Sequence, residues 1–477
     1  MAIHAHNYLF AEQVIKDPSR PTYHLVSPWK EAHIADPNFA FFWKGRYHLF
    51  YISGTSGFAH VSSTDMLHWR YHPNTNFSGL SGTMFLNRDS VPTIISKPDS
   101  LIRMLTPLDD DLEKWEVVTT IEPTFKPGQD GSRMGNTYWD PDAWTEGDTT
   151  YVLLGEFPLE PENEAALLKS VDMKTWHFVD YFLPEDMPGV ISGHDYKTND
   201  DLSCPNFFKI GNKWMLLCIS HNKGCRYYLG DWKDEKFTPD FHGWMNWSKE
   251  DVEGKYGHGG EVFAPESLLT PDGRRVMWAW LFAQTQRRIS ENWHEVMSLP
   301  RELSLPEDGV LRIKPLRELE QLRYNPVSEK DLIVEDGTFY RLKNISGDAI
   351  EMMVTIKQGD AKRYGVRVLC DKDNGKGLDL VVEPARKILR LGEITAPLEL
   401  KSDEDIQLRI FIDRSVVEVF ANERQAMAKQ HVYTAGDVGV CLFSESGKMK
   451  VSEVRGWKIK PAYVDEGAVS EKLPHMN

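Results

Sequence analysis

Two acidic residues of this chain each stand directly before a proline and a few residues ahead of an apolar run. Asp36 occurs in Ala-Asp-Pro-Asn at residues 35–38, and Asp140 occurs in Trp-Asp-Pro-Asp at residues 139–142. A single Asp-Pro pair is most often a plain turn. Hydrolysis of a glycosidic bond, however, uses two carboxyl groups, one ionised and one protonated. Two such sites, each close to a strand, therefore suggest carboxylates that converge from separate parts of the fold.

The elements that must position these carboxylates are short strands. Aromatic and β-branched residues alternate in short runs, and a glycine-containing turn precedes the clearest of them. These lie at residues 46–51, 150–154, 213–217 and 275–280, with a weaker strand at 91–95. A second pattern, Asp-x-x-x-Trp, begins at Asp65, Asp111 and Asp172. Recurring units of several short strands are typical of a β-propeller, and five units fit residues 1–312. A two-sheet sandwich with long loops is the alternative, but it does not account for the repeats.

A second domain follows the repeats. Residues 313–326 are rich in Leu, Glu and Arg at helical spacing and predict a linker helix. Over residues 327–462 strands return, with two-residue alternation but without the Trp-marked repeat, which predicts a separate β-sandwich. Residues 463–477 are polar and predict a frayed tail. The predicted fold class is therefore all-β, a five-bladed β-propeller followed by a C-terminal β-sandwich.

Composition narrows the class of partner and the compartment. The chain has 477 residues, too many for one compact core, and a formal net charge of −16, which argues against nucleic acid or an anionic membrane surface. No apolar stretch approaches the ~20 residues of a membrane span, and the N-terminus lacks the pattern of a signal peptide. The five cysteines show neither CxxC nor metal-ligand spacing. We therefore expect a cytoplasmic protein without a cofactor or metal; its oligomeric state has no signal in the sequence.

Over nearly its whole length the chain resembles glycoside hydrolase family 32, the invertase, levanase and inulinase group. Two long segments carry the resemblance most strongly, Ser-Leu-Pro-Arg-Glu-Leu-Ser-Leu at 298–305 and Ile-Asp-Arg-Ser-Val-Val-Glu-Val-Phe at 412–420. Shorter matches occur at residues 35–38, 46–51, 65–69, 77–79 and 139–141. The two long segments leave little room for chance similarity.

The resemblance implies a retaining glycoside hydrolase or transglycosidase that acts on β-fructofuranosides, with a small carbohydrate as its substrate. Asp36 falls at the position of the family's nucleophile. Asp140 falls at that of the carboxylate that holds sugar hydroxyls and steadies the transition state. The expected substrate-binding residues are Asn38, Trp43, Phe77, Ser78, Trp139, Ser203 and Glu261.

Three departures from the family pattern fall in the presumed pocket. The family's acid/base is the Glu of Glu-Cys-Pro-Asp, whereas residues 203–206 here read Ser-Cys-Pro-Asn. A serine hydroxyl cannot protonate a leaving alkoxide effectively. The Arg beside the stabilising Asp is replaced by Trp139. The Asn before the nucleophile is replaced by Ala35, and Phe39 stands where a Gly follows Asn38.

Different hypotheses account for these departures. In the first, the acid has moved, with candidates at Asp200, Asp201, Glu261 and Glu266. Glu266 is preferred and Glu261 comes next; we expect one of them to reach the same funnel as Asp36 with a raised pKa. A surface carboxylate paired with Arg274 or Arg275 is the alternative for Glu266. In the second hypothesis the protein binds carbohydrate without turnover. In the third it cleaves another furanoside, such as an arabinofuranoside.

Overall fold

The computed structural model describes residues 17–27, 33–54, 57–98, 101–132, 139–155, 164–183, 201–221, 224–245, 247, 262–282, 295–372 and 375–462, and for Leu80 and Trp139 it describes the backbone alone. The regular secondary structure of the described residues is almost entirely β-strand, which confirms the all-β prediction. Their helical elements include two short 3-10 helices, η4 (Arg317–Leu322) and η5 (Pro384–Arg386). None of the described helices has the length and apolarity needed to cross a membrane.

The N-terminal part of the described chain contains five sheets of four or five strands, which are antiparallel except for the parallel pairing of β9 with β13 in the third sheet. The first two sheets contain β1 (Pro37–Trp43), β2 (Arg46–Ile52), β3 (Phe58–Ser63) and β4 (Arg70–Tyr71), then β5 (Leu80–Leu86), β6 (Pro92–Lys97), β7 (Ile102–Pro107) and β8 (Trp115–Ile121). The third contains β10 (Trp139–Glu146), β11 (Thr149–Gly155), β12 (Ala166–Ser170), β13 (Trp176–Tyr181) and β9 (Pro123–Thr124). The last two contain β14 (Ser203–Ile210), β15 (Lys213–Ser220), β16 (Gly224–Lys233) and β17 (Lys236–Trp244), then β18 (Val262–Leu269), β19 (Arg275–Leu281), β20 (Val296–Met297), β21 (Arg301–Ser304) and β22 (Arg312–Pro315).

The apolar runs seen in the sequence are the second strands of four of these sheets, β2, β11, β15 and β19. Each lies between two hydrogen-bonded neighbours, and most of its residues are buried. A strand covered on both faces needs a continuous apolar run rather than strict alternation. This is why these strands are the clearest in the sequence.

The Asp-x-x-x-Trp repeats form turns that lead into the fourth strand of a sheet. Asp65 Oδ1 accepts hydrogen bonds from the backbone N–H groups of Leu67 and His68, both at 2.9 Å. Asp172 Oδ1 binds the N–H groups two and three residues ahead of it in the same way. A side chain that caps its own turn in this manner explains the Asp. The tryptophans of the three repeats, Trp69, Trp115 and Trp176, are buried and pack the sheets.

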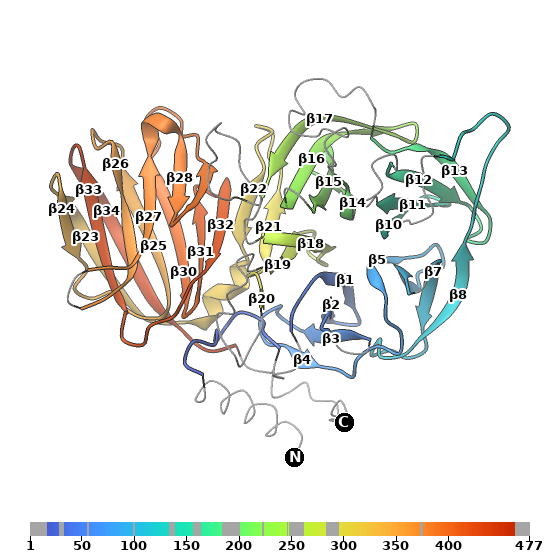
Figure 1. Cartoon of the computed structure of the whole chain (residues 1–477), viewed down its shortest axis with the longest axis horizontal. Helices are drawn as coiled ribbons and strands as arrows, with labels where there is room; N and C mark the ends of the chain where they lie inside the picture. Colours follow the sequence, from blue (N-terminus) through green and yellow to red (C-terminus); the bar gives the residue numbers. More distant parts are fainter. Residues whose placement is uncertain are drawn as a thin grey trace, which may run out of the picture.

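The first strands of the five sheets gather around one centre. β1, β5, β10, β14 and β18 contact one another in cyclic order, with β18 returning to β1. Figure 1 shows these five strands together in the middle of the right-hand part, with the remaining strands of each sheet lying farther out. This arrangement fits a β-propeller.

The C-terminal part consists of two six-stranded antiparallel sheets, which fit a β-sandwich (Figure 1). One contains β23 (Arg323–Val334), β34 (Met449–Ile459), β25 (Ala349–Lys357), β30 (Ile406–Asp413), β31 (Val416–Ala421) and β32 (Gln425–Gln430). The other contains β24 (Thr338–Arg341), β33 (Gly439–Glu445), β26 (Arg363–Cys370), β27 (Leu378–Glu383), β28 (Ile388–Leu391) and β29 (Ile394–Pro397). Their facing side chains form a core of their own, with Val354, Val366 and Ile410 among its buried members.

The segment expected to be a linker helix at 313–326 is shorter and mostly extended. β22 pairs with β21 up to Pro315, and β23 pairs with β34 from Arg323 onward. Only η4 between them is helical, with Leu319 and Leu322 buried. Strand pairing on both sides has overridden the helical propensity of the flanking residues.

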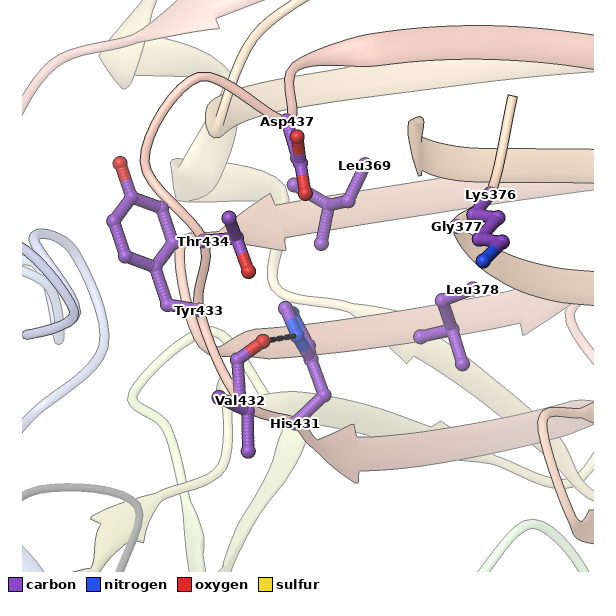
Figure 2. A pocket seen from close by; sticks show the side chains of 9 residues that line it. All are labelled: Leu369, Lys376, Gly377, Leu378, His431, Val432, Tyr433, Thr434 and Asp437. Carbon is purple, nitrogen blue, oxygen red and sulfur yellow. Dashed lines mark hydrogen bonds between the residues drawn. The ribbon is translucent and has the colours of Figure 1, made fainter. Parts of the chain in front are cut away.

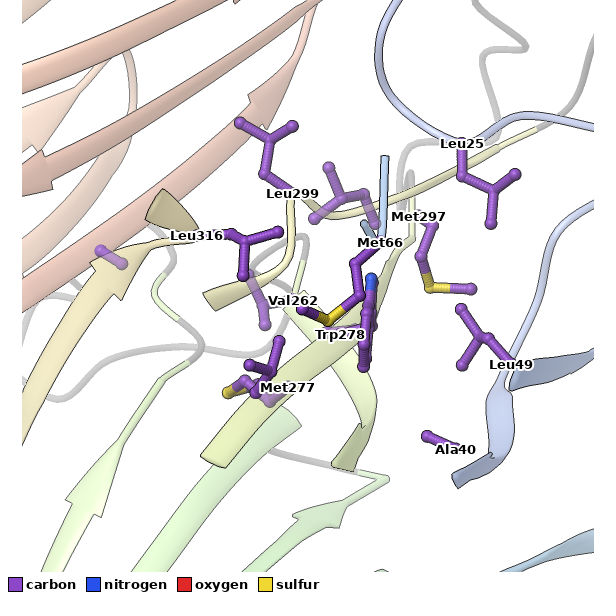
Figure 3. Packing of buried hydrophobic residues seen from close by; sticks show 14 of the residues in the cluster. Leu25, Ala40, Leu49, Met66, Val262, Met277, Trp278, Met297, Leu299 and Leu316 are labelled. Carbon is purple, nitrogen blue, oxygen red and sulfur yellow. The ribbon is translucent and has the colours of Figure 1, made fainter. Parts of the chain in front are cut away.

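The two parts of the chain share one apolar core. Buried side chains of the first and last N-terminal sheets pack with Phe411, Val416 and Phe420 of the sandwich. Figure 3 shows Trp278 and Met277 of β19 beside Leu299 and Leu316, which follow β20 and β22. The last N-terminal sheet is therefore the surface on which the sandwich rests.

A buried group of charges lies at the same interface. Both of the long sequence motifs contribute to it: Arg301 donates to Glu418 Oε2 at 2.7 Å, and both side chains are fully buried. His24 lies between Asp413 and Glu418, with its ring nitrogens 2.9 and 3.3 Å from their oxygens. Burial lowers the pKa of His24, but the two carboxylates outweigh it and raise this pKa to about 9. The two motifs are thus the two sides of one inter-domain contact.

We expect the stability of the protein to fall between pH 6.5 and 9.5. His24 has a folded-state pKa of about 9 against 6.5 when unfolded, so its contribution, of the order of 3 kcal/mol, is complete below pH 6.5 and is lost as the pH rises through 9. Urea unfolding at several pH values measures the change. The His24→Asn variant should be less stable and should lose this part of the pH dependence. If its free energy of unfolding fell with pH as steeply as that of the wild type, His24 would not be the group responsible.

Candidate active site

Each of the five inner strands begins with a β-bulge. The pairing register shifts between residues 38 and 41, 80 and 83, 139 and 142, 203 and 206, and 263 and 266. In four of them the residue after the first has a positive φ, with Phe39 at 44°, Asp140 at 45°, Cys204 at 48° and Ala264 at 43°. Bulges turn side chains away from the pleat, and non-glycine residues at positive φ mark strained positions.

The residues turned by these bulges meet at one end of the inner strands. Ser81 donates to Asp36 Oδ2 at 3.2 Å, and Asp36 itself precedes β1. The backbone N–H of Cys204 donates to Asp140 Oδ2 at 3.2 Å, and the Cys204 thiol lies 3.5 Å from the same oxygen. Asp36 and Asp140, which are 104 residues apart in the sequence, therefore belong to one site.

Both carboxyl groups are less acidic than in water. Removal from water, followed by repulsion from Asp140, raises the pKa of Asp36 to about 6. Burial also raises the pKa of Asp140, against the hydrogen bond from Cys204. Asp36 is thus still mainly ionised at neutral pH, as a nucleophile must be. Burial and the same two carboxylates raise the pKa of the Cys204 thiol, which therefore stays protonated and is a poor nucleophile.

Ser203 lies beside Asp140, because it directly precedes Cys204. It is hydrogen-bonded to Asp201, which in turn contacts His221. Ser203 is fully buried, and its hydroxyl donates to Asp201 Oδ2 at 3.0 Å. Asp201 also accepts a 2.8 Å hydrogen bond from the backbone N–H of His221 and lies 2.7 Å from its Nδ1. At the position where the family carries its acid, the protein thus has a chain of Ser203, Asp201 and His221.

Polar side chains farther along the inner strands join the five sheets to one another. In each case a side-chain oxygen accepts a hydrogen bond from a backbone N–H group of the next sheet, and the last sheet binds the first. The bonds are Gly82 N–H to Asn38 (3.0 Å), Ala143 N–H to Thr83 (3.2 Å), Phe207 N–H to Asp142 (2.6 Å), Ser267 N–H to Asn206 (2.8 Å) and Ala40 N–H to Glu266 (3.0 Å). We call these five side chains the inter-sheet ring.

The prolines of the bulges explain which backbone N–H group of each sheet donates to the inter-sheet ring. Ala40 and Gly82 are the second bulge residues of their strands, and each donates directly to the ring. Pro141, Pro205 and Pro265 occupy the same place in the other three strands and have no N–H. There the bond comes from the residue two positions later. The Asp-Pro at Asp140 is therefore part of this bulge rather than a plain turn.

Glu266 belongs to the inter-sheet ring. Besides the bond from Ala40, its other oxygen accepts a 2.9 Å bond from the Asn206 amide. Burial raises its pKa to about 8, as expected from the sequence, but the neighbouring charges are Asp142 and Arg275. Glu266 is 3% exposed, so it is not a surface carboxylate, and Arg274 binds Asp272, Glu302 and Glu318 instead.

Four of the five ring residues, Thr83, Asp142, Asn206 and Glu266, line a cavity of about 300 Å³ that lies downstream of the bulges. Arg275 contributes to it as well. Its lining begins at residues 40, 83, 142, 206 and 266 of the inner strands and runs on toward their ends. Asp36, by contrast, lies before β1, and Ser81, Asp140 and Ser203 are the first or second residues of their strands. The carboxyl groups of Asp36 and Glu266 thus belong to two successive levels of the same five strands.

The remaining predicted contacts lie in several environments. Asn38 is fully buried in the ring. Trp43 and Phe77 are half-buried at the edge of the aromatic cluster around Phe39. Ser78 is exposed. Glu261 and Asp200 lie outside the described residues, and Trp139 is described for its backbone only.

Three residues near the site had not been expected there from the sequence. Ser81 holds Asp36, and His221 binds Asp201. Glu295 lies just before β20. Burial and the charge of Asp36 raise its pKa to about 7, although the contact with Trp280 lowers it. All three follow or begin a strand next to an inner-strand motif. Pairing between strands is the signal that would have located them.

Half-buried aromatic side chains lie next to His221 and Glu295. The Phe263 ring is 6.0 Å from the His221 ring and 6.1 Å from the indole of Trp280, and Phe282 is 4.5 Å from that indole. Flat apolar faces of this kind can pack against a sugar ring. They form one wall beside the carboxylates.

Two other places in the described chain resemble a binding site: a group of three histidines and a cavity in the C-terminal part. His48, His60 and His72 have ring nitrogens within 4.8 Å of one another. However, His60 and His72 stack at 4.0 Å with an interplanar angle of 16°, so their in-plane lone pairs do not meet at one ion. His48 also bonds to His60 at 2.9 Å, and His72 contacts Ser62 and Glu113. We treat this group as a hydrogen-bonded stack.

A cavity of about 280 Å³ lies in the C-terminal part (Figure 2). Its lining includes His431, which contacts the Val432 carbonyl, together with Tyr433 and Thr434. Asp437 is the one carboxylate among its lining residues. Hydrolysis of a glycoside by two carboxyl groups is therefore not supported there.

Comparison with known proteins gives matches over most of the chain. The family model "Glycosyl hydrolases family 32 N-terminal domain" matches residues 26–315, and "Glycosyl hydrolases family 32 C terminal" matches residues 318–458. A raffinose invertase of Escherichia coli is 27% identical over 468 residues, covering 87% of this chain and 90% of that protein. Among solved structures, fructan 1-exohydrolase IIa from Cichorium intybus superimposes with a TM-score of 0.73 at 18% identity, covering 94% of this chain and 99% of that one. Sucrose-6-phosphate hydrolase from Lactobacillus gasseri gives 0.72 at 18%, covering 95% and 96%.

We predict that Glu266→Ala lowers the free energy of unfolding by about 1–3 kcal/mol, because the Ala40 N–H and the Asn206 amide lose a buried partner. Glu266→Gln, which keeps the shape and one acceptor, should lose less stability and should keep most of the turnover of a fructoside. Urea unfolding and a sucrose hydrolysis assay on both variants measure this. A loss of turnover by Glu266→Gln that is confined to substrates with poor leaving groups would instead make Glu266 the acid.

Proposed function

The chain belongs to glycoside hydrolase family 32 and is a glycoside hydrolase of the β-fructofuranosidase type, and we propose that it works with retention of configuration through Asp36. The observation that carries this proposal is the meeting of Asp36 and Asp140 at the starts of separate inner strands, with Ser81 holding the first and Cys204 the second. The reaction requires a carboxylate nucleophile, and a second carboxylate beside it can stabilise the positive charge that develops on the sugar ring.

In the first step, a carboxylate oxygen of Asp36 attacks the anomeric carbon of the fructofuranosyl unit. Its pKa of about 6 leaves it ionised at neutral pH, and the Ser81 hydroxyl directs one oxygen. Asp140, held in a bulge at a φ of 45°, binds sugar hydroxyls and stabilises the developing positive charge of the ring. Water, or a second sugar in a transfer reaction, then releases the sugar from Asp36.

The architecture supporting this site is, we propose, a five-bladed propeller. The five sheets, the cyclic contacts of their first strands and the inter-sheet ring that closes from Glu266 onto Ala40 support that count. A propeller ending at Pro315 and a sandwich beginning at Arg323 agree with the two family matches.

The substrate we propose is a small carbohydrate with a terminal β-fructofuranosyl unit. The relatives named above are an invertase, a fructan exohydrolase and a sucrose-6-phosphate hydrolase. Phe263, Trp280 and Phe282 would pack against the sugar. We also propose a cytoplasmic location, because all five cysteines are buried and none of them forms a disulfide bond, as in a reducing compartment.

A silent sugar-binding protein is the second candidate, and Ser203 is the observation that favours it. This residue replaces the family's acid and is buried against Asp201. A protein that lost its proton donor without replacement would keep the sugar contacts of Asp140 and the aromatic wall. It would bind fructosides without cleaving them.

We predict that the protein releases fructose from sucrose or a kestose and that Asp36→Asn abolishes this release. The variant should be at least as stable as the wild type. Burial raises the pKa of Asp36 to about 6, which means that its ionised form costs folding free energy at neutral pH, and Asn carries no charge. Sugar release is measured by chromatography over a panel that also contains arabinofuranosides. In the presence of methanol, a retaining enzyme gives methyl β-fructofuranoside, which NMR identifies.

Asp65→Asn is the matched control, since Asp65 caps a turn of the same sheet away from the site. The α-anomer as the methanolysis product would refute retention. Binding of sucrose by calorimetry without any release would favour the silent binder, and cleavage of arabinofuranosides alone would change the substrate class.

A further inference from the structure

The proposed reaction lacks a proton donor at its usual place. Departure of a sugar alkoxide needs a proton at the glycosidic oxygen, and general acid catalysis contributes about 10²–10⁴-fold to such a step. Ser203 cannot supply this proton, and Glu266 is committed to the inter-sheet ring. Among the described residues, the donor is therefore to be sought in another titratable group close to Asp36 and Asp140.

Strand pairing places His221 next to Ser203. Ser203 of β14 pairs with Ile219 of β15, and His221 follows the last residue of β15. Asp201, which precedes β14, bridges the two: it accepts the Ser203 hydroxyl at 3.0 Å and lies 2.7 Å from His221 Nδ1. Asp201 is 1% exposed at its side chain and His221 is 35% exposed, so the carboxylate is buried behind an imidazole that solvent and substrate can reach.

The charge of His221 acts on both carboxylates. The charge of His221 lowers the pKa of Asp36 and that of Asp140, against burial in each case. In return, burial lowers the pKa of His221, but the hydrogen bond to Asp201 and then the charges of Asp201, Asp140 and Asp36 raise it above 6.5. Phe263 covers the ring from the neighbouring sheet. These interactions favour the cationic form of the imidazole.

We propose that His221 is the proton donor of this enzyme and that Asp201 positions it. This proposal rests on the proposed function and names the acid that it lacks. Nδ1 stays bound to Asp201, and Nε2 carries the proton that is transferred, the arrangement of a histidine–carboxylate pair. His221 would be a catalytic residue, whereas Asp201 and Ser203 act through it.

The proton and electron changes balance without any further reactant. Asp36 forms a bond to the anomeric carbon while the bond from that carbon to the glycosidic oxygen breaks. The electron pair goes to the leaving oxygen, which takes the proton from His221 Nε2 and departs as an alcohol. Neutral His221 then takes a proton from water as the water oxygen attacks the same carbon, and Asp36 is released as a carboxylate.

Glu295 is the competing donor that the experiment must separate from His221. It is close enough to Asp36 for their charges to interact, and its pKa of about 7 would leave part of it protonated. However, it lies before β20 in the last N-terminal sheet, on the side of the Trp280 indole, whereas Asp201 and Ser203 lie at the start of β14. The position of the family's acid therefore favours His221.

The test compares two leaving groups in the His221→Gln variant. With sucrose, whose leaving group needs a proton, we expect kcat to fall by about 10²–10⁴-fold; with a 4-nitrophenyl β-fructofuranoside, which needs none, we expect less than about a tenfold change. His68→Gln is the matched control, because His68 lies 2.7 Å from Asp65 with 33% exposure and is part of an outer turn. It should not change either rate.

The pH profile provides an independent readout. Turnover should rise with pH as Asp36 ionises around pH 6, and it should fall at higher pH as His221 loses its proton. His221→Gln should remove the alkaline decline, and Asp201→Asn should move it to lower pH. A purely structural role for these residues would leave the shape of the profile unchanged.

Each outcome decides between the possible donors. Equal loss on both substrates in His221→Gln, or selective loss in Glu295→Gln instead, would overturn the assignment to His221. Failure of the wild type to cleave either substrate would refute the proposed function itself, and this is distinguishable because the aryl fructoside needs Asp36 but no acid. Circular dichroism of each variant excludes unfolding as the cause.

Discussion

Hydrogen bonds between neighbouring inner strands hold the five N-terminal sheets at the spacing on which the site depends. In the inter-sheet ring, a side chain of each sheet binds a backbone N–H of the next, and Glu266 closes the ring onto Ala40. These bonds are buried, so losing a partner would leave a polar group without water. Because the bulges lie just upstream of the ring, the ring also sets where Ser81, Asp140 and Cys204 point.

The inner strands thus carry two sets of buried polar side chains, one at the bulges and one in the inter-sheet ring, and the two sets have different hydrogen-bond partners. At the bulges, the carboxylates of Asp36 and Asp140 accept hydrogen bonds from one or two donors. At the ring, carboxylates and amides are saturated by backbone N–H groups and join the sheets. Glu266 has a raised pKa for the same reason as Asp36, removal from water. A perturbed pKa therefore marks buried carboxyl groups of both kinds, and only their hydrogen-bond partners separate a catalytic role from a structural one.

The sandwich contributes to the site indirectly, through the last N-terminal sheet. The buried contact of Arg301 with Glu418 attaches the sandwich to β21, and that of His24 with Asp413 attaches it to the segment before β1. β20, which precedes β21, begins directly after Glu295 and pairs with Trp280. An inter-domain interface thus supports the sheet that lies beside the aromatic wall. This accounts for why two motifs far from the carboxylates are among the most recognisable of the sequence.

The sequence by itself determined the all-β class, the family and the pairing of Asp36 with Asp140, because strand runs, turn residues and contiguous motifs are local patterns. It did not determine the role of Glu266 or find His221 and Ser81. A carboxylate after a proline looks the same whether it faces a sugar or a neighbouring N–H group. Which of the two it meets depends on strand register and on the packing of sheets far apart in the chain, and only the tertiary structure decides that.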